Sequence, residues 1–277
     1  MKNVTVGKLL KKHKIRPNKK LGQNFLADPN LIDKLIDALD VYPDEDVLEI
    51  GSGLSVLTAK LGLHAQRILA IEKDKRLLNI AREEFSELAN LTFHEADFLK
   101  CDLSSLLKKY HTPIKVIGNI PYYISSQIIL ALLDNAPLFQ RAVLTVQKEV
   151  ADRLAAEPSS KDYGILTIFI GAKAQCDKLF DLAPEAFIPP PEVTSTAIKI
   201  TFTKNPSFQI QNELLFKKIV KTAFQQRRKT IKNSLKILLK NNRIKPWSSC
   251  NIEPELRPEQ LTVEQYVALA NYLAPLV

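Results

Sequence analysis

The chain has 277 residues, of which 45% are hydrophobic and 25% charged, which is typical of a globular protein with one large domain or a large and a small one. It contains no run of 18 uncharged apolar residues, and its basic N-terminus lacks the apolar core and cleavage site of a secretory signal. Three scattered cysteines and four histidines show no disulfide or metal-binding spacing. The composition predicts a cytoplasmic protein with no membrane contact and no metal site.

The formal net charge of +9 is unevenly distributed along the chain. The first twenty residues hold eight Lys or Arg and no acid, and the stretch from Glu213 to Lys245 holds eleven against that one Glu. Basic blocks at both ends favour a polyanionic partner, nucleic acid above all. The alternative is a solvated helix face or a disordered tail.

An alternation of helical and strand patterns fills the first part of the chain. Asp28 and Pro29 begin a helix, because a side-chain cap and a proline in the first turn precede apolar residues spaced three and four apart. Short apolar runs predict strands at 46–50, 67–72, 91–97, 114–119 and 141–147. Helical patterns lie between them, at 54–62, 75–89, 103–110 and 125–134. Since parallel strands need crossover connections, we expect a parallel sheet with helices on both faces.

The pattern changes after residue 147. A helix is predicted at 148–156, and the segment 163–174 is compatible with either a helix or a strand. Two further strands, 176–184 and 195–202, are joined by a loop without a helix, which predicts an antiparallel end to the sheet. Only helical patterns follow Glu213. We therefore predict a domain at 1–204 with a basic N-terminal arm, and a helical RNA-binding domain at 205–277.

Polar residues and glycines stand at the carboxyl ends of the predicted strands, where open parallel sheets bind ligands. Two glycines in "EIGSG" let a ligand approach the backbone, but a dinucleotide fingerprint would need a third glycine where Val56 stands. Glu72 is placed to accept hydrogen bonds from the two hydroxyl groups of a ribose. Asp97 is placed to accept a hydrogen bond from an exocyclic amine such as adenine N6. The series predicts a site for a nucleoside without a phosphate chain. Its members are Gly51, Gly53, Glu72, Asp97 and Asn119.

These strand ends, together with "GNIPYYIS" at 118–125, resemble those of S-adenosylmethionine-dependent methyltransferases that act on an exocyclic amine. Almost the whole chain resembles the bacterial small-subunit rRNA adenine dimethyltransferases, through the segments "KKLGQNFL" (19–26), "VQKEVADRL" (146–154), "FIPPPEVTS" (187–195), "AFQQRRKTIKNSL" (223–235) and "LRPEQLTVEQYVALAN" (256–271). The resemblance implies an α/β fold, a Rossmann-like seven-stranded class I methyltransferase sheet with a small C-terminal all-helical domain. It also implies S-adenosyl-L-methionine as cofactor and dimethylation of N6 in two adjacent adenosines of the 3′-terminal hairpin loop of 16S rRNA. We expect a monomer that acts on a partly assembled 30S subunit.

The resemblance also implies roles for single residues. Around the cofactor, Asn24 and Leu26 close over its methionine end with Gln23 nearby, Gly51 and Gly53 form the backbone turn, Glu72 holds the ribose, Asp97 binds the adenine amine, and Asn119 lies between cofactor and target. Position 52 carries Ser where many relatives have Pro or Ala. A backbone role for the turn does not depend on that side chain.

The stretch "NIPY" suits methylation of an adenine amine, whose lone pair is delocalised into the ring. Acceptors around N6 can localise that lone pair, and the resemblance assigns them to the Asn119 side-chain oxygen and the Ile120 carbonyl. Pro121 restrains Ile120 to an extended shape. Tyr122 and Phe187 would stack on the two faces of the target base. The alternatives are that Asn119 caps the next helix, that the tyrosines are half-buried packing, and that the proline triplet is only a connection.

The segment "FQQRRKTIKNSL" combines a cationic face with an apolar one. Its predicted RNA-binding residues are Arg227, Arg228, Lys229 and Lys232, with a buried structural role for Arg228 as the alternative. Other functions stay open. These are a large-subunit rRNA adenine methyltransferase conferring antibiotic resistance and a catalytically silent RNA-binding assembly factor. Val56 disfavours an NAD-dependent enzyme.

Overall fold

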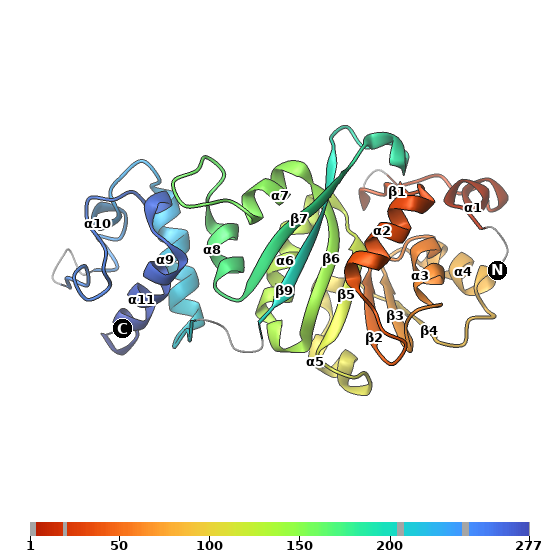
Figure 1. The fold of residues 1–277 in the computed structure, drawn as a ribbon, viewed down its shortest axis with the longest axis horizontal. Coiled ribbons are helices and arrows are strands. Elements are labelled where there is room, and N and C mark those ends of the chain that lie inside the picture. Colours follow the sequence, from red (N-terminus) through yellow and green to blue (C-terminus); the bar gives the residue numbers. More distant parts are fainter. Residues whose placement is uncertain (1–3, 19–20, 204–207, 240–243, 277) are drawn as a thin grey trace. The chain divides into compact units, whose positions relative to one another are not determined.

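The computed structural model describes residues 4–18, 21–203, 208–239 and 244–276 (Figure 1). The chain forms two compact units. The first, called the sheet unit, comprises the residues up to Ala151 and the segment 177–202; the second, called the helical unit, comprises 152–176 and the residues from Thr203 on. Residues 152–176 thus belong with the C-terminal helices, although we predicted them in the N-terminal domain. The predicted boundary between residues 204 and 205 lies outside the described residues.

A seven-stranded sheet forms the centre of the sheet unit within the described residues. Its strands are β2 (Asp46–Ile50), β3 (Arg67–Glu72), β4 (Leu91–Glu95), β5 (Ile114–Asn119), β6 (Phe139–Gln147), β7 (Ala174–Leu182) and β9 (Ser195–Phe202). Their order is β4-β3-β2-β5-β6-β9-β7. Strands β2 to β6 are parallel, whereas β9 runs antiparallel to β6, from Arg141 opposite Thr201 to Gln147 opposite Ser195. Both the parallel sheet and its antiparallel end are therefore confirmed.

Helices of the sheet unit follow the predicted alternation, with shorter bounds. They are α1 (Val6–Lys12), α2 (Pro29–Leu39), α3 (Val56–Leu61), α4 (Lys75–Glu84), α5 (Leu103–Leu106) and α6 (Ser125–Asp134). The start of α2 is as expected, because the Asp28 carboxylate accepts hydrogen bonds from the N–H groups of Asn30 and Leu31. Asp74 caps α4 in the same way.

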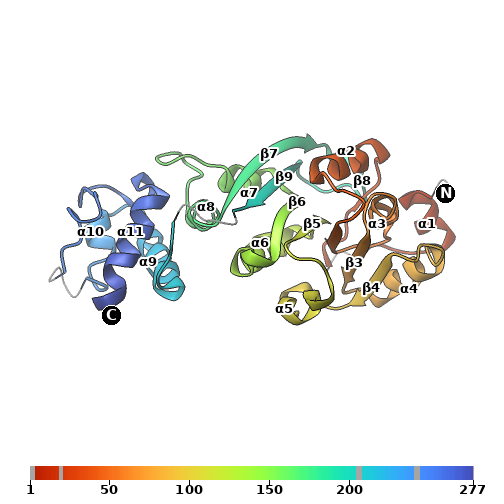
Figure 2. The same cartoon turned by 60° about the horizontal axis from the view of Figure 1, so that its bottom comes forward.

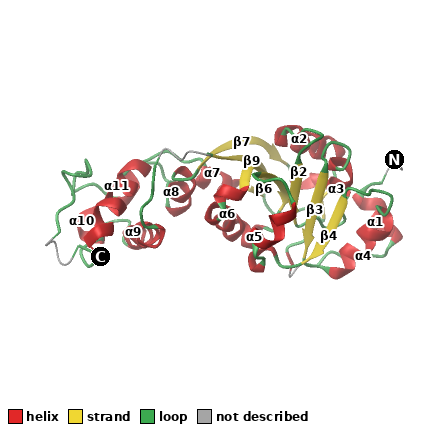
Figure 3. Cartoon of the chain, turned by 90° about the horizontal axis from the view of Figure 1, so that it is seen from below, coloured by secondary structure: helices red, strands yellow, loops and turns green. Residues whose placement is uncertain are grey.

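The apolar stripes of these helices bury the two faces of the sheet. Helices α2 and α3 pack on one face, where Leu35 and Leu61 join Val47 and Ile117 in one core cluster. Helix α6 lies on the opposite face, as Figures 2 and 3 show. The layers leave the carboxyl ends of the central strands uncovered by these helices, so that edge of the sheet is where the loops gather.

A two-stranded sheet that the sequence did not predict joins β1 (Phe25–Leu26) to β8 (Phe187–Ile188), with Leu26 opposite Phe187. Both strands have only two residues, too few for an alternating pattern to be visible in the sequence. This pairing attaches the N-terminal segment to the connection between β7 and β9.

The helical unit contains α8 (Ile165–Gly171), α9 (Glu213–Gln225), α10 (Ile231–Ser234) and α11 (Val263–Leu273), and α7 (Lys148–Leu154) spans its boundary. The ambiguous segment 163–174 is thus mainly helical. Ring centroids of Phe169 on α8 and Phe216 on α9 lie 5.8 Å apart, and the buried Tyr163 hydroxyl donates to the Leu261 carbonyl at 2.8 Å. No helix in the described parts of the chain is long and apolar enough to cross a membrane.

Candidate functional site

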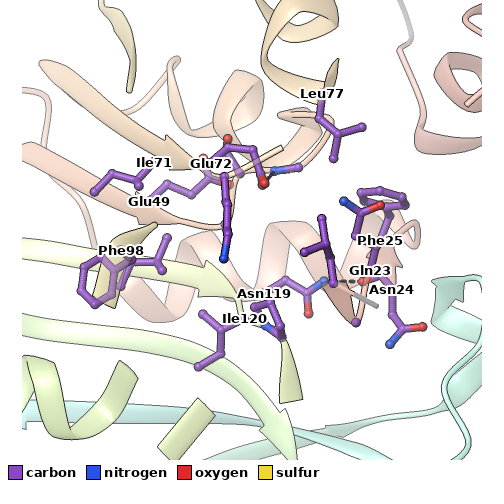
Figure 4. Close-up of a pocket in the computed structure, with 18 of the residues that line it drawn as sticks. Gln23, Asn24, Phe25, Glu49, Ile71, Glu72, Leu77, Phe98, Asn119 and Ile120 are labelled. Atoms are coloured by element: carbon purple, nitrogen blue, oxygen red, sulfur yellow. Dashed lines mark hydrogen bonds between the residues drawn. The ribbon is translucent and has the colours of Figure 1, made fainter. Parts of the chain in front are cut away.

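A cavity of about 230 Å³ lies at the carboxyl ends of the parallel strands. Its wall contains eleven of the twelve residues predicted for the cofactor and the reaction: Gln23, Asn24, Leu26, Gly51, Gly53, Glu72, Asp97, Asn119, Ile120, Pro121 and Tyr122. Figure 4 shows Glu49 of β2, Glu72 of β3 and Asn119 of β5 around the same cavity. The predicted convergence of the strand ends is therefore observed.

The two glycines of "EIGSG" make the turn that follows β2. Gly51 and Gly53 have φ angles of +73° and +55°, in the left-handed region that favours glycine. The Gly51 N–H donates to the Ile71 carbonyl at 2.8 Å, and the Gly53 N–H donates to Glu72 Oε2 at 2.9 Å. The turn therefore folds back over the end of β3 and holds the Glu72 side chain in place.

Glu72 is a buried carboxyl held by backbone donors. Besides Gly53, the Asp74 N–H donates to its Oε1 at 2.8 Å. Burial raises the pKa of Glu72, and the backbone N–H groups oppose that rise. Because each carboxylate oxygen has two lone pairs, Glu72 keeps acceptor capacity toward the cavity.

Asp97 lies two residues after the end of β4, on the rim of the cavity. It caps the 3₁₀ turn Phe98–Lys100, and its carboxylate accepts from Lys73 Nζ at 2.9 Å. This hydrogen bond from Lys73 holds the pKa of Asp97 below its usual value, so Asp97 is ionised at neutral pH. An exocyclic amine would therefore meet an acceptor that already binds one cation.

Asn119 occupies the tip of β5. Its side-chain Nδ2 donates to the Asn24 carbonyl at 2.7 Å, as the dashed line in Figure 4 marks. Since a carbonyl can only accept, this bond fixes the amide orientation and leaves Oδ1 as a hydrogen-bond acceptor. The caps of the following 3₁₀ turn and of α6 are Pro121 and Ile124, so Asn119 does not cap the next helix.

The residues after Asn119 have different surroundings. Pro121 has φ −61° and ψ 131°, with φ in the range that its ring imposes. The Tyr122 hydroxyl lies 2.5 Å from Ser195 Oγ, which anchors its ring at the cavity wall. Tyr123, by contrast, is 58% exposed at the cavity mouth.

Phe187 is not on the cavity wall. Its ring is 2% exposed and packs in the same core cluster as Leu26 and Val47. The predicted stacking of Phe187 on the target base stays a prediction that this geometry does not support, because burial leaves no ring face open.

Gln23 connects two segments instead of facing the solvent. Its Nε2 donates to Asp74 Oδ2 at 3.0 Å, and its Oε1 accepts from the Asn18 N–H at 2.8 Å. Gln23 therefore fastens the N-terminal segment to the start of α4, and so positions Asn24 beside Asn119.

Comparison with known proteins agrees with this geometry. A family model described as "Ribosomal RNA adenine dimethylase" matches residues 14–275. The chain belongs to this family. Adenine dimethylases of ribosomal RNA are methyltransferases, so the enzyme class expected from the sequence is confirmed.

Individual relatives of the dimethylase family extend over nearly the whole chain. The "Ribosomal RNA small subunit methyltransferase A" of Syntrophus aciditrophicus is 39% identical, covering 97% of this chain and 98% of that protein. A crystal structure of a dimethyladenosine transferase from Plasmodium falciparum is 26% identical, with a TM-score of 0.77 over 91% of this chain and 98% of that one. The 23S rRNA methyltransferase ErmE is 25% identical, with a TM-score of 0.69 over 90% of this chain and 99% of that one. The predicted class I methyltransferase fold is thereby confirmed.

Two charged residues of this dimethylase's cavity were not predicted. Lys73 follows Glu72 directly and pairs with Asp97, and the proximity of these strand ends could have indicated it. Glu49 lies within β2, is 3% exposed and lines the cavity floor. Its signal in the sequence was an acid inside the apolar run "DVLEI".

The predicted RNA-binding residues of the dimethylase do not share one environment. Arg227 donates from its Nη2 to the carbonyls of Ser160 and Lys161, at 3.3 and 3.0 Å, and so has a structural role within the helical unit. Arg228 and Lys229 are exposed, and Lys232 is half-buried. The structural role that we considered for Arg228 is thus observed for its neighbour Arg227. In the described parts of the chain, no group of three His, Cys, Asp or Glu could hold a metal ion.

Proposed function

We propose that this chain transfers methyl groups from S-adenosyl-L-methionine to N6 of two adjacent adenosines in the 3′-terminal hairpin loop of 16S rRNA, giving N6,N6-dimethyladenosine. The observation that carries the proposal is the hydrogen bond from Asn119 Nδ2 to the Asn24 carbonyl at 2.7 Å. It leaves a neutral amide oxygen as acceptor at the tip of β5, on the wall of a cavity that also holds Glu72 and Asp97.

The residues around the cavity fit such a cofactor. Buried Glu72 suits a ribose with two hydroxyl donors, and Asp97 suits an exocyclic amine. The only cation on the described cavity wall is Lys73, which is paired with Asp97, so the wall suits a ligand without phosphates. When bound, S-adenosylmethionine supplies an electrophilic methyl group on a sulfonium.

Residues beside the cavity would prepare the adenine amine. Asn119 Oδ1 and the Ile120 carbonyl would accept hydrogen bonds from the two N6–H groups and orient the lone pair away from the ring. As N6 becomes cationic its proton becomes acidic and can leave to water, so oriented neutral acceptors suffice and no ionised base is required. A neutral acceptor also tolerates an amine that has already gained one methyl group and lost one N–H.

Tyr122 would hold the target base against the cavity wall. Its hydroxyl contact with Ser195 fixes the ring, which lowers the entropy lost when a base stacks on it. Stacking of a base on such a ring contributes about 1–3 kcal/mol. A base flipped out of its stack would thus be held by stacking on Tyr122 together with the hydrogen bonds from its N6 to Asn119 and Ile120.

The helical unit supports RNA as the substrate. It contains sixteen Lys and Arg against eight Asp and Glu, whereas the sheet unit is close to neutral. The exposed Arg228 and Lys229 would contact phosphates, which give affinity without sequence specificity. We propose a partly assembled 30S subunit as the substrate, a monomeric enzyme and, because the substrate is ribosomal, a cytoplasmic location. The similarity to ErmE keeps a large-subunit adenosine as the second candidate target.

The test uses the purified protein and labelled cofactor with unmethylated 30S subunits and, in parallel, unmethylated 50S subunits, followed by mass mapping of the modified nucleotides. Asn119→Ala should reduce methyl transfer about 10²–10³-fold, the usual effect of removing one oriented polar group that stabilises developing charge, and leave cofactor affinity within a few-fold. Exposed Asn79 on α4 provides the matched control, since Asn79→Ala should have no effect. Full activity of Asn119→Ala would remove this residue from the mechanism, and label on 23S rRNA alone would replace the target.

A further inference from the structure

The strand register places Glu49 directly behind the row of predicted ligand-binding residues. Ile50 pairs with Ile71 on β3, and Glu49 pairs with Ile117 on β5. Continued past these pairs, the register aligns Gly51 with Glu72 on one side and with Asn119 on the other. Because side chains alternate along a strand, Glu49 points to the same face one pleat deeper. It therefore forms part of the cavity floor, as Figure 4 shows.

The Glu49 carboxyl has no partner for one of its oxygens. Its Oε2 is buried and makes no hydrogen bond with a described group, and the same holds for the hydroxyls of Ser52 and Ser55, which also line the cavity. Burial raises the pKa of Glu49 to about 8, and the negative charge of Glu72 adds to the rise. The Thr58 hydroxyl opposes the rise, although it makes no hydrogen bond of normal geometry.

Groups from the neighbouring elements supply no positive charge to Glu49. From β3 comes Glu72, which is itself acidic. On α3, Lys60 is paired with Asp33 of α2 at 2.5 Å. Lys115, on β5, pairs with Glu45 at the opposite end of the strands.

The described part of the cavity rim adds no cation that is available to Glu49. Its charged residues are Lys73 and Asp97, which are paired with one another at 2.9 Å. In the described part of the cavity wall, four side chains are charged or acidic, and three of them are carboxyls. Among the described residues no cation is left to neutralise Glu49, so the neutralising cation would enter with a ligand.

We propose that Glu49 loses its proton when a cationic ligand enters this cavity, so that ligand binding and proton release are coupled. This inference rests on the proposed function, because the proposed cofactor carries a sulfonium and an ammonium group. The carboxylic acid passes its proton to the buffer, and the carboxylate that remains neutralises the charge of the ligand. A neutral floor in the free protein avoids the cost of an isolated buried anion.

The coupling has a defined dependence on pH. At pH 7 a carboxyl with a pKa of about 8 is about nine-tenths protonated. As pH increases toward 8, ligand affinity should therefore rise by up to about tenfold per pH unit, and it should level off above pH 8. If Glu49 were ionised throughout this pH range, ligand affinity would not depend on pH in this way.

Isothermal titration calorimetry tests the proposal with the full-length protein and S-adenosylmethionine at pH 7, in buffers of different ionisation enthalpy. The wild-type protein should release up to about one proton more than Glu49→Gln, because the ligand's own proton exchange is common to both. Asp97→Asn is the matched control. The pKa of Asp97 is already low, so this variant should bind more weakly with an unchanged proton count.

Equal proton release by the wild-type protein and Glu49→Gln would overturn the inference. If the variant does not fold, a wild-type affinity that is flat between pH 6 and 8 in the same titrations would overturn it as well. A titration with S-adenosylhomocysteine assigns the cation. Proton release only with the sulfonium form implicates the sulfonium, and equal release with both forms implicates the ammonium. The absence of any binding would contradict the proposed cofactor, whereas binding without the Glu49 proton contradicts only the coupling.

Discussion

Gly118→Ala should impair methyl transfer although Gly118 touches no reacting group. Gly118 precedes Asn119 on β5, and a Cβ added there would lie 2.6 Å from the Ile50 carbonyl oxygen and 3.1 Å from Ile120 Cγ2. Real Cβ contacts essentially never fall below 3.0 Å, so the tip of β2 must move away from β5 by about 0.4 Å or more. The obstructing atom belongs to the backbone and cannot rotate away.

The magnitude follows from this displacement. Overpacking of a closely packed interior costs about 1–3 kcal/mol. For a protein of this size, that corresponds to a decrease in Tm of about 2–12 °C. Since a 1 Å misplacement of a reacting group can cost about 10²-fold in rate, a shift of a few tenths of an ångström beside Asn119 should reduce kcat about tenfold.

The assay is methyl transfer to unmethylated 30S subunits, combined with thermal denaturation of the same protein. Gly7→Ala is the control, because a Cβ at this position in α1 meets only Ile188 Cδ1 at an ordinary 3.8 Å and favours the helix. Gly118→Ala with the wild-type rate and Tm would refute the reasoning, since β5 would then have room for a side chain at its tip.

Other predictions concern stability, RNA binding and pH. Phe187→Ala should lower the free energy of unfolding by about 3–5 kcal/mol in a denaturant titration, because the ring is buried in the core; an unchanged stability would place it outside. Arg227→Ala should lower the Tm, because it removes the charge-assisted hydrogen bonds to the Ser160 and Lys161 carbonyls, which contribute about 1–3 kcal/mol. Arg228→Ala should leave the Tm unchanged and reduce the slope of log RNA affinity against log salt concentration by about one. A lower Tm for Arg228→Ala together with a reduced salt slope for Arg227→Ala would show that Arg228 is the structural residue and Arg227 the RNA contact. Without ligand, stability should fall as pH rises from about 5 to about 8, because folded Glu49 keeps its proton longer than the unfolded chain does, and Glu49→Gln should remove this fall.

Features carried by local patterns could be predicted from the sequence. The five parallel strands follow from apolar runs bounded by polar residues, and α2 follows from its Asp28 cap and Pro29. The β1–β8 pair could not be predicted, because two-residue strands have no measurable period and their partners are far apart in sequence. Segment 163–174 was ambiguous because its apolar residues are nearly continuous, and it is packing against α9 that makes it helical.

The candidate site was predictable where topology alone brings residues together. Strand ends converge in any parallel sheet, so Glu72, Asp97 and Asn119 could be grouped without knowing a single contact. Long-range contacts were not predictable. The burial of Phe187 depends on the β1 pairing, and the structural role of Arg227 depends on carbonyls more than sixty residues away. Glu49 was overlooked because an acid within an apolar run can be recognised as a floor residue only when the neighbouring strands are in place.

The division of the chain has a consequence for its synthesis. The polypeptide passes between the two units three times, after residues 151, 176 and 202, so α8 is made before the helix that covers it. About forty residues separate the end of α8 from the start of α9, and ribosomes add about 5–20 residues per second. The nascent chain should therefore expose the apolar side of α8 for about two to eight seconds. A shortened protein ending near residue 204 would expose it permanently, and should aggregate instead of yielding a free-standing N-terminal enzyme.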